Sequence, residues 1–370
     1  MLNKNRVVVG MSGGVDSTVA AFKLKEMGYE VIGINMRLWQ DPHLEEMHLL
    51  HDGGCCSLSS VEDARRVCEQ IGIPFYALDF KQVFKETVVD YFITSYEHGE
   101  TPNPCIACNK FVKFDALLEK AKQLGAQYVA TGHYAKILFN AETKRYEIRK
   151  SNAIEKDQTY ALYNLTQEQL SHILMPLGDY ASKDEVRAIA AQFDVQISRK
   201  SDSQEICFIP DDDYVGFLDR NGNVNAEAGN FVSTRGEVLG KHAGITKYTI
   251  GQRKGLGITF GKPMYVVGID PAKNQVVLGE NEDVFSKELY ADTLNFIPFE
   301  DFEDGFKASA KIRYSAKTAL CKLYHVPGPV NMVKVVFEDL QRAITPGQAI
   351  VFYDEDQLIG GGTIRRYLTK

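Results

Sequence analysis

The sequence lacks any long apolar run, and it has few cysteines for its length. No stretch reaches the roughly 20 apolar residues that a membrane-spanning helix needs, so no membrane partner is expected. The first residues do not form the charged-then-apolar pattern of a secretory leader. Seven cysteines among 370 residues, an odd number, argue against a disulfide scaffold and favour a reducing compartment. We therefore expect a globular cytoplasmic protein.

The overall charge decides little about partners. The net charge is −7, which by itself argues against a nucleic-acid partner. From Gly305 to the end, however, there are ten Lys and Arg residues against five Asp and Glu residues. A locally basic surface can bind RNA on an acidic protein, so the charge leaves RNA open.

Strand and helix patterns alternate in the first half of the chain. Apolar runs predict strands at 7–9, 30–36, 74–79 and 128–133, and helical spacing predicts helices at 61–71, 81–96 and 114–124. This alternation predicts a parallel sheet with helices on both faces, and ligands then bind at the carboxyl ends of the strands. Later strands follow one another between frequent glycines, the last at 307–314, 333–337 and 349–353. We predict an α/β domain over 1–210, a small central mostly-β domain over 211–285 and a C-terminal β-barrel over 286–370.

The most informative stretch is Gly10-Met11-Ser12-Gly13-Gly14-Val15-Asp16-Ser17, which follows the first strand. A strand that turns through glycines into a helix is typical of an anion site, because backbone N–H groups and the positive helix end point at the ligand. We expect Asp16 or Ser17 to cap the helix. The stretch is neither G-x-x-x-x-G-K-[ST] nor G-x-G-x-x-G, and it has no lysine to reach phosphates. It resembles the PP-loop of ATP pyrophosphatases, in which Asp16 would suit Mg²⁺; the alternative is an ordinary Ser/Gly turn.

Two cysteines form a C-x-x-C pattern in the Pro-rich segment 101–108. Cys105 and Cys108 are compatible with zinc ligands, with a redox pair, or with one catalytic thiol and a bystander. No second C-x-x-C or paired His completes a usual zinc site. Cys108 is expected at the start of a helix, which would lower its pKa and favour the thiolate.

The other cysteines carry less information. Cys207 follows a polar stretch and precedes an apolar one, so a buried small hydrophobe is the simplest interpretation. The same interpretation is favoured for the remaining four, Cys55, Cys56, Cys68 and Cys321.

Further motifs follow in a family-specific order. They are Thr-Pro-Asn-Pro at 101–104, Cys-Asn-Lys at 108–110, Thr-Gly-His-Tyr at 131–134, Lys-Asp-Gln at 156–158, Ser-Asp-Ser at 201–203, Ile-Cys-Phe at 206–208 and the Gly-rich stretch 248–257. Together with the loop at 12–17, they make the chain similar over essentially its whole length to the tRNA 2-thiouridylases of the MnmA type, within the PP-loop superfamily.

The resemblance implies an ATP-dependent sulfurtransferase that converts the wobble uridine of tRNA to 2-thiouridine. The uridine 2-oxygen would be adenylated with release of pyrophosphate and then leave as AMP. By motif match, Cys207 would carry a persulfide and Cys108 would be the partner thiol. The implied partners are tRNA (the Lys, Glu and Gln isoacceptors) and a sulfur donor, either a cysteine desulfurase or a sulfur relay protein.

The resemblance also assigns the binding residues by motif match. The implied ATP contacts are Gly10, Met11, Ser12, Gly13, Gly14, Val15, Asp16, Ser17, Met36 and Gly132. The implied tRNA contacts are Asn103, Pro104, Cys105, His133, Lys156, Asp157, Gln158, Arg313, Tyr314 and Gln348. Without the family match, His133 would be taken as a core histidine, 156–158 as a polar turn and Arg313 as a solvated strand residue.

One position departs from the family pattern. Many members have Asp where this chain has Cys105, and a thiol would not serve as the same general acid or base. Cys105, Cys108 and Cys207 together also raise the alternative of an iron–sulfur cluster with one open iron. Two other functions compete. A PP-loop synthetase acting on a small molecule would leave the two thiols unexplained, and an RNA-binding module with a degenerate loop would form no AMP.

Overall fold

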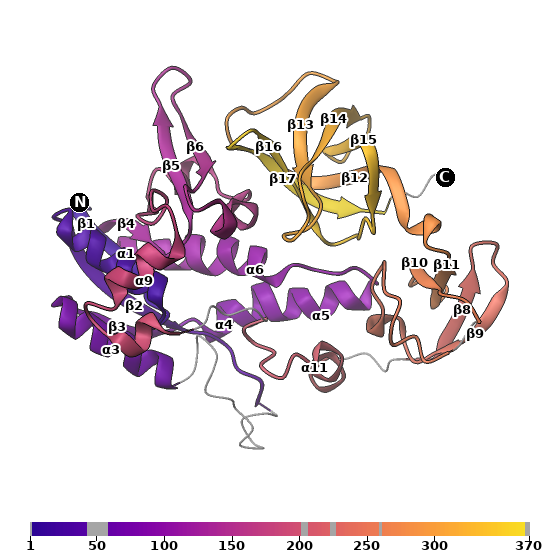
Figure 1. Cartoon of the computed structure of the whole chain (residues 1–370), viewed down its shortest axis with the longest axis horizontal. Coiled ribbons are helices and arrows are strands. Elements are labelled where there is room, and N and C mark those ends of the chain that lie inside the picture. Colours follow the sequence, from indigo (N-terminus) through magenta and orange to yellow (C-terminus); the bar gives the residue numbers. More distant parts are fainter. Residues whose placement is uncertain (1, 43–57, 201–205, 223–226, 259–260, 367–370) are drawn as a thin grey trace. The chain divides into compact units, whose positions relative to one another are not determined.

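The computed structural model describes residues 2–42, 58–200, 206–222, 227–258 and 261–366 (Figure 1). The chain forms two compact units, each assembled from segments far apart in sequence. The first comprises Met1–Val89, Cys105–Asp212 and Asp356–Ile359. The second comprises Asp90–Pro104, Asp213–Glu355 and Gly360–Lys370. The domain boundaries after residues 210 and 285 stay predictions.

The first unit is built on a parallel sheet. Its strand order is β3-β2-β1-β4-β7, with bounds β1 Asn3–Gly10, β2 Glu30–Arg37, β3 Phe75–Asp79, β4 Ala126–Ala130 and β7 Ile173–Leu174. Val8 in the central strand pairs with Ile32 on one side and Val129 on the other. The three valines of β1 are completely buried, as a central parallel strand requires. The predicted sheet is therefore confirmed.

Helices cover this sheet. Helices α1 (Val15–Glu26), α3 (Leu58–Ile71) and α9 (Lys183–Ala190) form one core with Val7 and Val9 of β1. Helix α7 (Leu117–Gln123) packs on β4 and β1. The other helical segments of the first unit are α4 Lys81–Phe84, the π-helix η1 Lys85–Val89, α6 Pro104–Ala107 apart from its first residue, the π-helix η2 Cys108–Ala116, η3 Ile154–Lys156, η4 Thr159–Leu162, α8 Gln167–Leu170 and α10 Val195–Ser198. Helix α5, Asp90–Glu97, belongs to the second unit.

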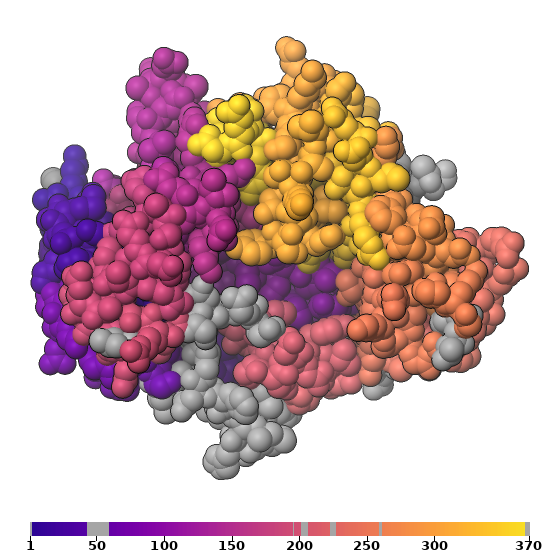
Figure 2. All heavy atoms as spheres, viewed as in Figure 1, coloured from indigo at the N-terminus to yellow at the C-terminus, as the bar shows by residue number. Residues whose placement is uncertain are grey.

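A hairpin that the sequence analysis did not predict belongs to the first unit. Strands β5 (Ala135–Asn140) and β6 (Arg145–Lys150) pair antiparallel, and the hairpin projects from this unit (Figures 1 and 2). Leu358 pairs with Ile148 of β6, so the far end of the chain contributes to this sheet. Phe139 on β5 is 56% exposed and packs its ring on Tyr146, 5.1 Å between centroids.

The second unit contains a small mixed sheet. Helix α11 (Tyr214–Asn221) precedes strands β8 (Gly229–Ser233), β9 (Val238–His242), β10 (Tyr265–Asp270) and β11 (Gln275–Gly279), in the order β10-β11-β8-β9. Short helices η5 (Ile245–Lys247) and η6 (Glu282–Val284) follow β9 and β11. The core of the sheet is built from Phe231, Tyr248, Val266, Val276 and Leu278. The predicted mostly-β texture is confirmed.

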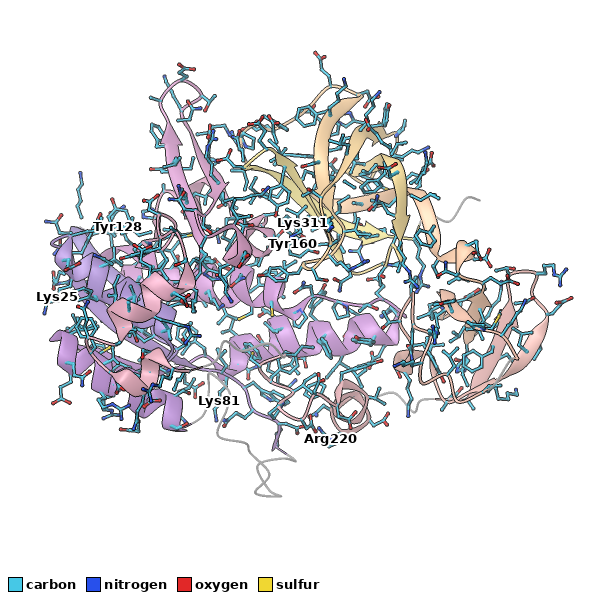
Figure 3. All side chains as sticks on the ribbon, viewed as in Figure 1. Lys25, Lys81, Tyr128, Tyr160, Arg220 and Lys311 are labelled. Atoms are coloured by element: carbon cyan, nitrogen blue, oxygen red, sulfur yellow. The ribbon has the colours of Figure 1, made fainter. Side chains whose placement is uncertain are left out.

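The second unit also contains a closed barrel. Its strands are β12 Phe285–Phe296, β13 Phe306–Lys311, β14 Ala319–Val326, β15 Met332–Arg342, β16 Ala349–Asp354 and β17 Gln357–Arg365. The order is β12-β15-β14-β13-β16-β17, and pairing of β12 with β17 closes it. The strand predicted at 307–314 extends too far at its C-terminal end. It ends at Lys311, so Arg313 and Tyr314 lie in the turn that follows. Figure 3 labels Lys311 on the barrel.

No helix among the described residues is long and apolar enough to span a bilayer.

Candidate active site

The phosphate loop connects β1 to α1, and no side chain caps the helix. The predicted cap at Asp16 or Ser17 is wrong, because the helix begins earlier and its N-cap is Gly14. The Ser17 hydroxyl instead accepts the Ser12 N–H at 3.2 Å and donates to the Gly14 carbonyl at 3.2 Å. Because Gly14 provides no side-chain cap, the first N–H groups of α1 are not capped from that position, which suits an anion site.

Two glycines are required for the shape of this loop. Gly13 has φ 71°, and a Cβ there would lie 2.3 Å from the Ser60 carbonyl oxygen. A Cβ at Gly132, just after β4, would lie 2.6 Å from the Asp16 Cβ and 2.8 Å from the Ser17 nitrogen. The carboxyl end of β4 therefore touches the loop.

The end of β2 meets the same loop. A Cβ at Gly10 would lie 3.5 Å from the Met36 Cε. Asn35 is buried, and its side-chain amide donates to the Met11 carbonyl at 2.8 Å. The structure thus brings together all of the predicted ATP residues, Gly10–Ser17, Met36 and Gly132. That they bind ATP stays a prediction.

Two lysines reach the loop from outside it, and neither was predicted from the sequence. Lys183 Nζ lies 2.6 Å and 2.7 Å from the two carboxylate oxygens of Asp16. Lys200 donates to the Gly13 carbonyl at 3.1 Å and pairs with Asp63. The Ser-x-x-Glu pattern at 182–185 predicts a helix that starts at Lys183, but no local pattern says where that lysine points.

A tyrosine connects the loop to the Lys-Asp-Gln motif. The Tyr134 hydroxyl donates to Asp16 Oδ1 at 2.8 Å. The Tyr134 N–H donates to the Gln158 side chain at 3.0 Å, and the Gln158 N–H donates back to the Tyr134 carbonyl at 3.1 Å. Lys156 ends η3 just before this pair. The motif therefore lies near the phosphate loop, which its place in the sequence alone did not show.

Burial is the largest cause of the pKa shifts of two titratable groups in these motifs, His133 and Asp157. His133 is buried, with Nδ1 2.7 Å from the Thr131 hydroxyl, and its pKa lies well below the usual range because of burial and the positive charge of Lys113. It is therefore neutral at neutral pH. Burial also raises the pKa of Asp157, although the Thr159 hydroxyl donates to this carboxylate at 2.7 Å.

Cys108 does not lie at a helix N-terminus, contrary to the prediction. The helical segment begins at Pro104 with α6, and η2 follows from Cys108 without a break. Proline suits the first helical position, which explains the earlier start. The exposed Cys105 lies in the first turn, whereas Cys108 is buried one turn further in. Because the helix dipole acts within the first turn, its effect falls on Cys105 rather than Cys108.

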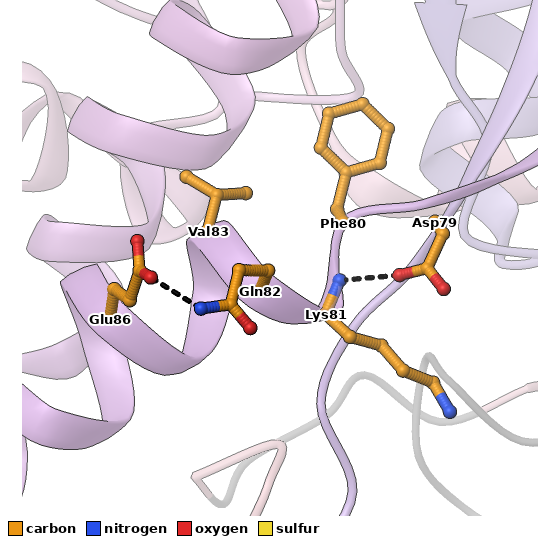
Figure 4. A pocket seen from close by; sticks show the side chains of 6 residues that line it. All are labelled: Asp79, Phe80, Lys81, Gln82, Val83 and Glu86. Carbon is orange, nitrogen blue, oxygen red and sulfur yellow. Dashed lines mark hydrogen bonds between the residues drawn. The ribbon is translucent and has the colours of Figure 1, made fainter.

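The Cys207 segment and the Cys108 helix pack on the same neighbour. Cys207 is half-buried in an irregular segment. The Phe208 ring packs on Phe84 of α4, 5.6 Å between centroids, and α4 in turn packs on η2. Beside α4 lies a cavity of about 570 Å³, lined by Asp79, Phe80, Lys81, Gln82, Val83 and Glu86 (Figure 4). It opens at the carboxyl end of β3, where ligands bind in sheets of this type.

The other two cysteines that the structure describes, Cys68 and Cys321, are buried thiols with raised pKa values. Burial raises the pKa of Cys68 to about 12, and burial together with Glu338 raises that of Cys321 to about 12. Both thiols stay protonated, as expected for small apolar residues. Cys55, Cys56 and the Ser-Asp-Ser motif at 201–203 lie outside the described residues.

The metal predictions differ in how well the residues fit. Mg²⁺ is usually held by one or two carboxylates together with substrate phosphates, so Asp16 at the phosphate loop fits it. In the described ranges, no group of three or more His, Cys, Asp or Glu side chains is placed to hold a metal ion. Cys105, Cys108 and Cys207 therefore do not fit an iron–sulfur cluster in this arrangement.

The remaining predicted tRNA residues belong to the second unit. Gln348 donates from its side-chain amide to the carbonyls of Thr101 and Pro102, at 2.9 Å and 3.1 Å. It thereby holds the segment that continues into Asn103 and Pro104. Tyr314 is half-exposed, with Lys311 Nζ 5.6 Å from its ring centroid. Arg313 donates to the Arg342 carbonyl at 3.0 Å.

Comparison with known proteins decides the family. The family described as "tRNA methyl transferase HUP domain" matches residues 5–211. A "PRC-barrel domain" of the same name matches 216–280, and an "Aminomethyltransferase beta-barrel domain" matches 286–364. A "tRNA-specific 2-thiouridylase MnmA" of Clostridioides difficile is 56% identical over 368 residues, which is 100% of each chain. The chain belongs to the MnmA family of tRNA-specific 2-thiouridylases.

Other MnmA proteins match equally broadly. Those of Clostridium acetobutylicum and Acetivibrio thermocellus are 56% and 54% identical over 364 residues, covering 98% of this chain and 100% of each relative. The first two family descriptions say methyl transfer, whereas the MnmA names say thiolation. We follow the latter, because these relatives match at high identity over their full length.

Proposed function

We propose that this chain catalyses the ATP-dependent 2-thiolation of the wobble uridine of tRNA, releasing AMP and pyrophosphate. The observation that carries the proposal is full-length identity of 56% to a tRNA-specific 2-thiouridylase. The phosphate loop, with its uncapped helix start, supports the ATP-dependent step. The buried Cys108 and the half-buried Cys207 support the sulfur step.

The first step makes the uridine 2-oxygen a leaving group. This oxygen attacks the α-phosphorus of ATP, and the bond from that phosphorus to the pyrophosphate oxygen breaks. The N–H groups at the start of α1 would receive the negative charge of the phosphates. Mg²⁺ held by Asp16 would neutralise further phosphate charge when bound.

The second step replaces the oxygen with sulfur. The terminal sulfur of a Cys207 persulfide attacks C2, and the C2–O bond breaks to release AMP. The Cys108 thiolate then attacks the Cys207 Sγ, and the electron pair of the broken S–S bond goes to the sulfur on C2. The product is 2-thiouridine together with a Cys108–Cys207 disulfide. Two external thiols, or one dithiol, must reduce this disulfide and become oxidised to a disulfide themselves.

An alternative order has the same balance. Cys108 attacks the persulfide first, forms the disulfide and releases hydrosulfide, which then attacks C2. Both orders need two thiols. In either case the persulfide comes from a sulfur donor, a cysteine desulfurase or a sulfur relay protein, and the reaction takes place in the cytoplasm.

The tRNA would contact both units. In the first unit the proposed contacts are Cys105, His133 and the Lys156–Gln158 motif; in the second they are Asn103, Pro104, Arg313, Tyr314 and Gln348. The proposed substrates are the Lys, Glu and Gln isoacceptors. Cys105 is exposed at the first turn of its helix, where it can approach an RNA base as a small polar group.

The test is replacement of each thiol. Cys108→Ser and Cys207→Ser should each reduce 2-thiouridine formation at least 100-fold, because the missing thiol interrupts the electron transfer of the second step. Binding of tRNA should stay within about twofold of wild type. Mass spectrometry of nucleosides after incubation with tRNA, ATP and a sulfur donor measures the product, and filter binding measures the tRNA.

The matched control is Cys68→Ala, which removes a buried thiol that stays protonated and should leave thiolation unchanged. Full thiolation by either serine variant would remove that cysteine from the mechanism. Failure of the wild type to form 2-thiouridine from any tRNA would remove the function itself.

A further inference from the structure

Lys183 is placed where a lysine is unfavourable unless it has a task. It is the first residue of α9, where the positive end of the helix dipole repels a cation. It is only 9% exposed, and lysines are rarely buried unless they are paired. Its neighbours Asp184 and Glu185 suit a helix start, and Ser182 caps the helix by accepting the Glu185 N–H at 3.3 Å. Helix formation therefore does not explain Lys183.

The partners of Lys183 place its charge beside the phosphate loop. Its ammonium contacts both oxygens of Asp16, at 2.6 Å and 2.7 Å, and Asp16 lies in the first turn of the uncapped helix α1. Tyr134 encloses the pair, because its hydroxyl donates to Asp16 and its ring centroid lies 5.6 Å from Lys183 Nζ. The Lys183 ammonium thus contacts a carboxylate that lies in the same helical turn as the N–H groups that attract an anion.

We propose that Lys183 is a phosphate-binding residue of the adenylation site. In the ATP-free protein it neutralises Asp16. With ATP and Mg²⁺ bound, the Asp16 carboxylate would hold the metal ion, and the Lys183 ammonium would contact a phosphate oxygen in place of Asp16. The exchange gives both charges a partner in both states, so neither is left buried and unpaired. This inference rests on the proposed function, since it assumes that the loop binds ATP.

Lys200 does not have the same placement. Its ammonium contacts the Gly13 carbonyl and pairs with Asp63, and its side chain is 38% exposed. It supports the backbone of the loop from outside. The structure therefore assigns the phosphate contact to Lys183, which pairs with the carboxylate that is expected to turn to Mg²⁺.

The test compares ATP with adenosine, which has no phosphates. Equilibrium dialysis of the full chain with each ligand and Mg²⁺, without tRNA, gives the two dissociation constants. Lys183→Met should weaken ATP binding at least tenfold and leave adenosine binding within twofold. Lys183→Arg should restore a large part of the ATP affinity, because it keeps the charge. The control is Lys23→Met on α1, a surface lysine paired with Glu26, which should change neither constant.

Two results would overturn the inference. One is unchanged ATP binding by Lys183→Met; the other is an equal loss for ATP and adenosine, which would indicate a purely structural role. If the single variant does not fold, Asp16→Asn/Lys183→Met leaves no charge without a partner. It must then bind ATP at least tenfold more weakly than Asp16→Asn alone, with adenosine binding equal in the two variants. The proposed function fails by a different result, namely the absence of 2-thiouridine from wild-type protein.

Discussion

At the scale of single residues, the phosphate loop depends on glycines, because a Cβ at these positions would collide with neighbouring backbone. Gly132→Ala would place a Cβ 2.6 Å from the Asp16 Cβ and 2.7 Å from its carbonyl carbon, so the loop backbone must move. We expect ATP affinity to fall at least tenfold and the free energy of unfolding to fall by about 1–3 kcal/mol, as for overpacked sites. Equilibrium dialysis and urea unfolding measure the two effects.

The matched control is Gly268→Ala on β10, where a Cβ would meet only the Val277 side chain at 3.5 Å, an ordinary contact. It should change ATP affinity less than twofold. If Gly132→Ala binds ATP as wild type does, the close approach of β4 to the loop does not matter for the nucleotide.

Single residues also mark the limit of sequence reasoning. The loop at Gly10–Ser17 was recognisable because a strand, glycines and a helix follow one another in the chain. Lys183 was missed, and Tyr134 was named only as part of the motif at 131–134, because their partner Asp16 lies 167 and 118 positions away. The cap was misplaced because Asp and Ser favour the N-cap in general, whereas here Gly14 takes that position and Ser17 bonds back into the loop.

At the scale of elements, regular periodicity was predictable and irregular helices were not. The strands near 30–36 and 74–79 appear as β2 and β3, with shifts of one residue at their ends. The helix expected from 114 instead begins at Pro104 and passes through the π-helix η2. A π-helix bonds residues five apart, so a search for a 3.6-residue period does not detect it. This is why Cys108 was taken for a helix start.

An element-scale prediction concerns the segment before the Pro104 helix. Gln348 holds the carbonyls of Thr101 and Pro102 with two hydrogen bonds, each worth about 0.5–1.5 kcal/mol. Gln348→Met keeps the volume and removes both donors. Amide hydrogen exchange over residues 98–104 should therefore accelerate about tenfold, as measured by mass spectrometry of peptides.

The control variant is Gln341→Met. The Gln341 side-chain amide donates to the Asp339 carbonyl at 3.1 Å, which is a local hydrogen bond between residues two positions apart. This variant should not change exchange at 98–104. Equal protection of this segment in wild type and Gln348→Met would mean that the two hydrogen bonds do not hold it, and would leave tRNA contact as the remaining role for Gln348.

At the scale of the whole molecule, two histidines give the two units opposite responses to pH. Burial holds the pKa of His133 well below 6.5. Below pH 6.5 the His133 imidazole is therefore protonated in the unfolded chain but stays neutral in the folded first unit. Its stability contribution is full above that pH and is lost as pH falls. Asp304 and Asp301 raise the pKa of His325 in the second unit, so its contribution is present below pH 6.5 and is lost as pH rises.

The single tryptophan, Trp39, reports unfolding of the first unit. Between pH 7 and 5.5, wild type should lose about 1 kcal/mol more than His133→Gln in urea unfolding followed by Trp39 fluorescence. His325→Gln should behave as wild type in this signal, since it belongs to the other unit. A pH dependence identical in wild type and His133→Gln would show that His133 takes up its proton in the folded protein as well.

The order of α/β, mixed and barrel parts was predictable, because strand spacing and glycine frequency change along the chain. The make-up of the compact units was not, because it depends on pairings between distant segments. Leu358 beside Ile148 is one such pairing, and no local pattern near either residue indicates it. The β5–β6 hairpin was missed for a related reason, since its strands carry exposed apolar residues such as Phe139.

The strand β17 has a consequence for how the protein is made. Its first residues and the preceding turn residue Asp356 belong to the first unit. Arg149 pairs there with Asp356 at 3.0 Å, and Leu358 extends the hairpin sheet. On the ribosome, residues 1–212 emerge on the order of ten seconds or more before residue 359, at ordinary rates of synthesis. During that interval the edge of β6 has no third strand. The nascent chain therefore carries an open β-edge, a template for misassembly between neighbouring polysomes, until translation is nearly complete.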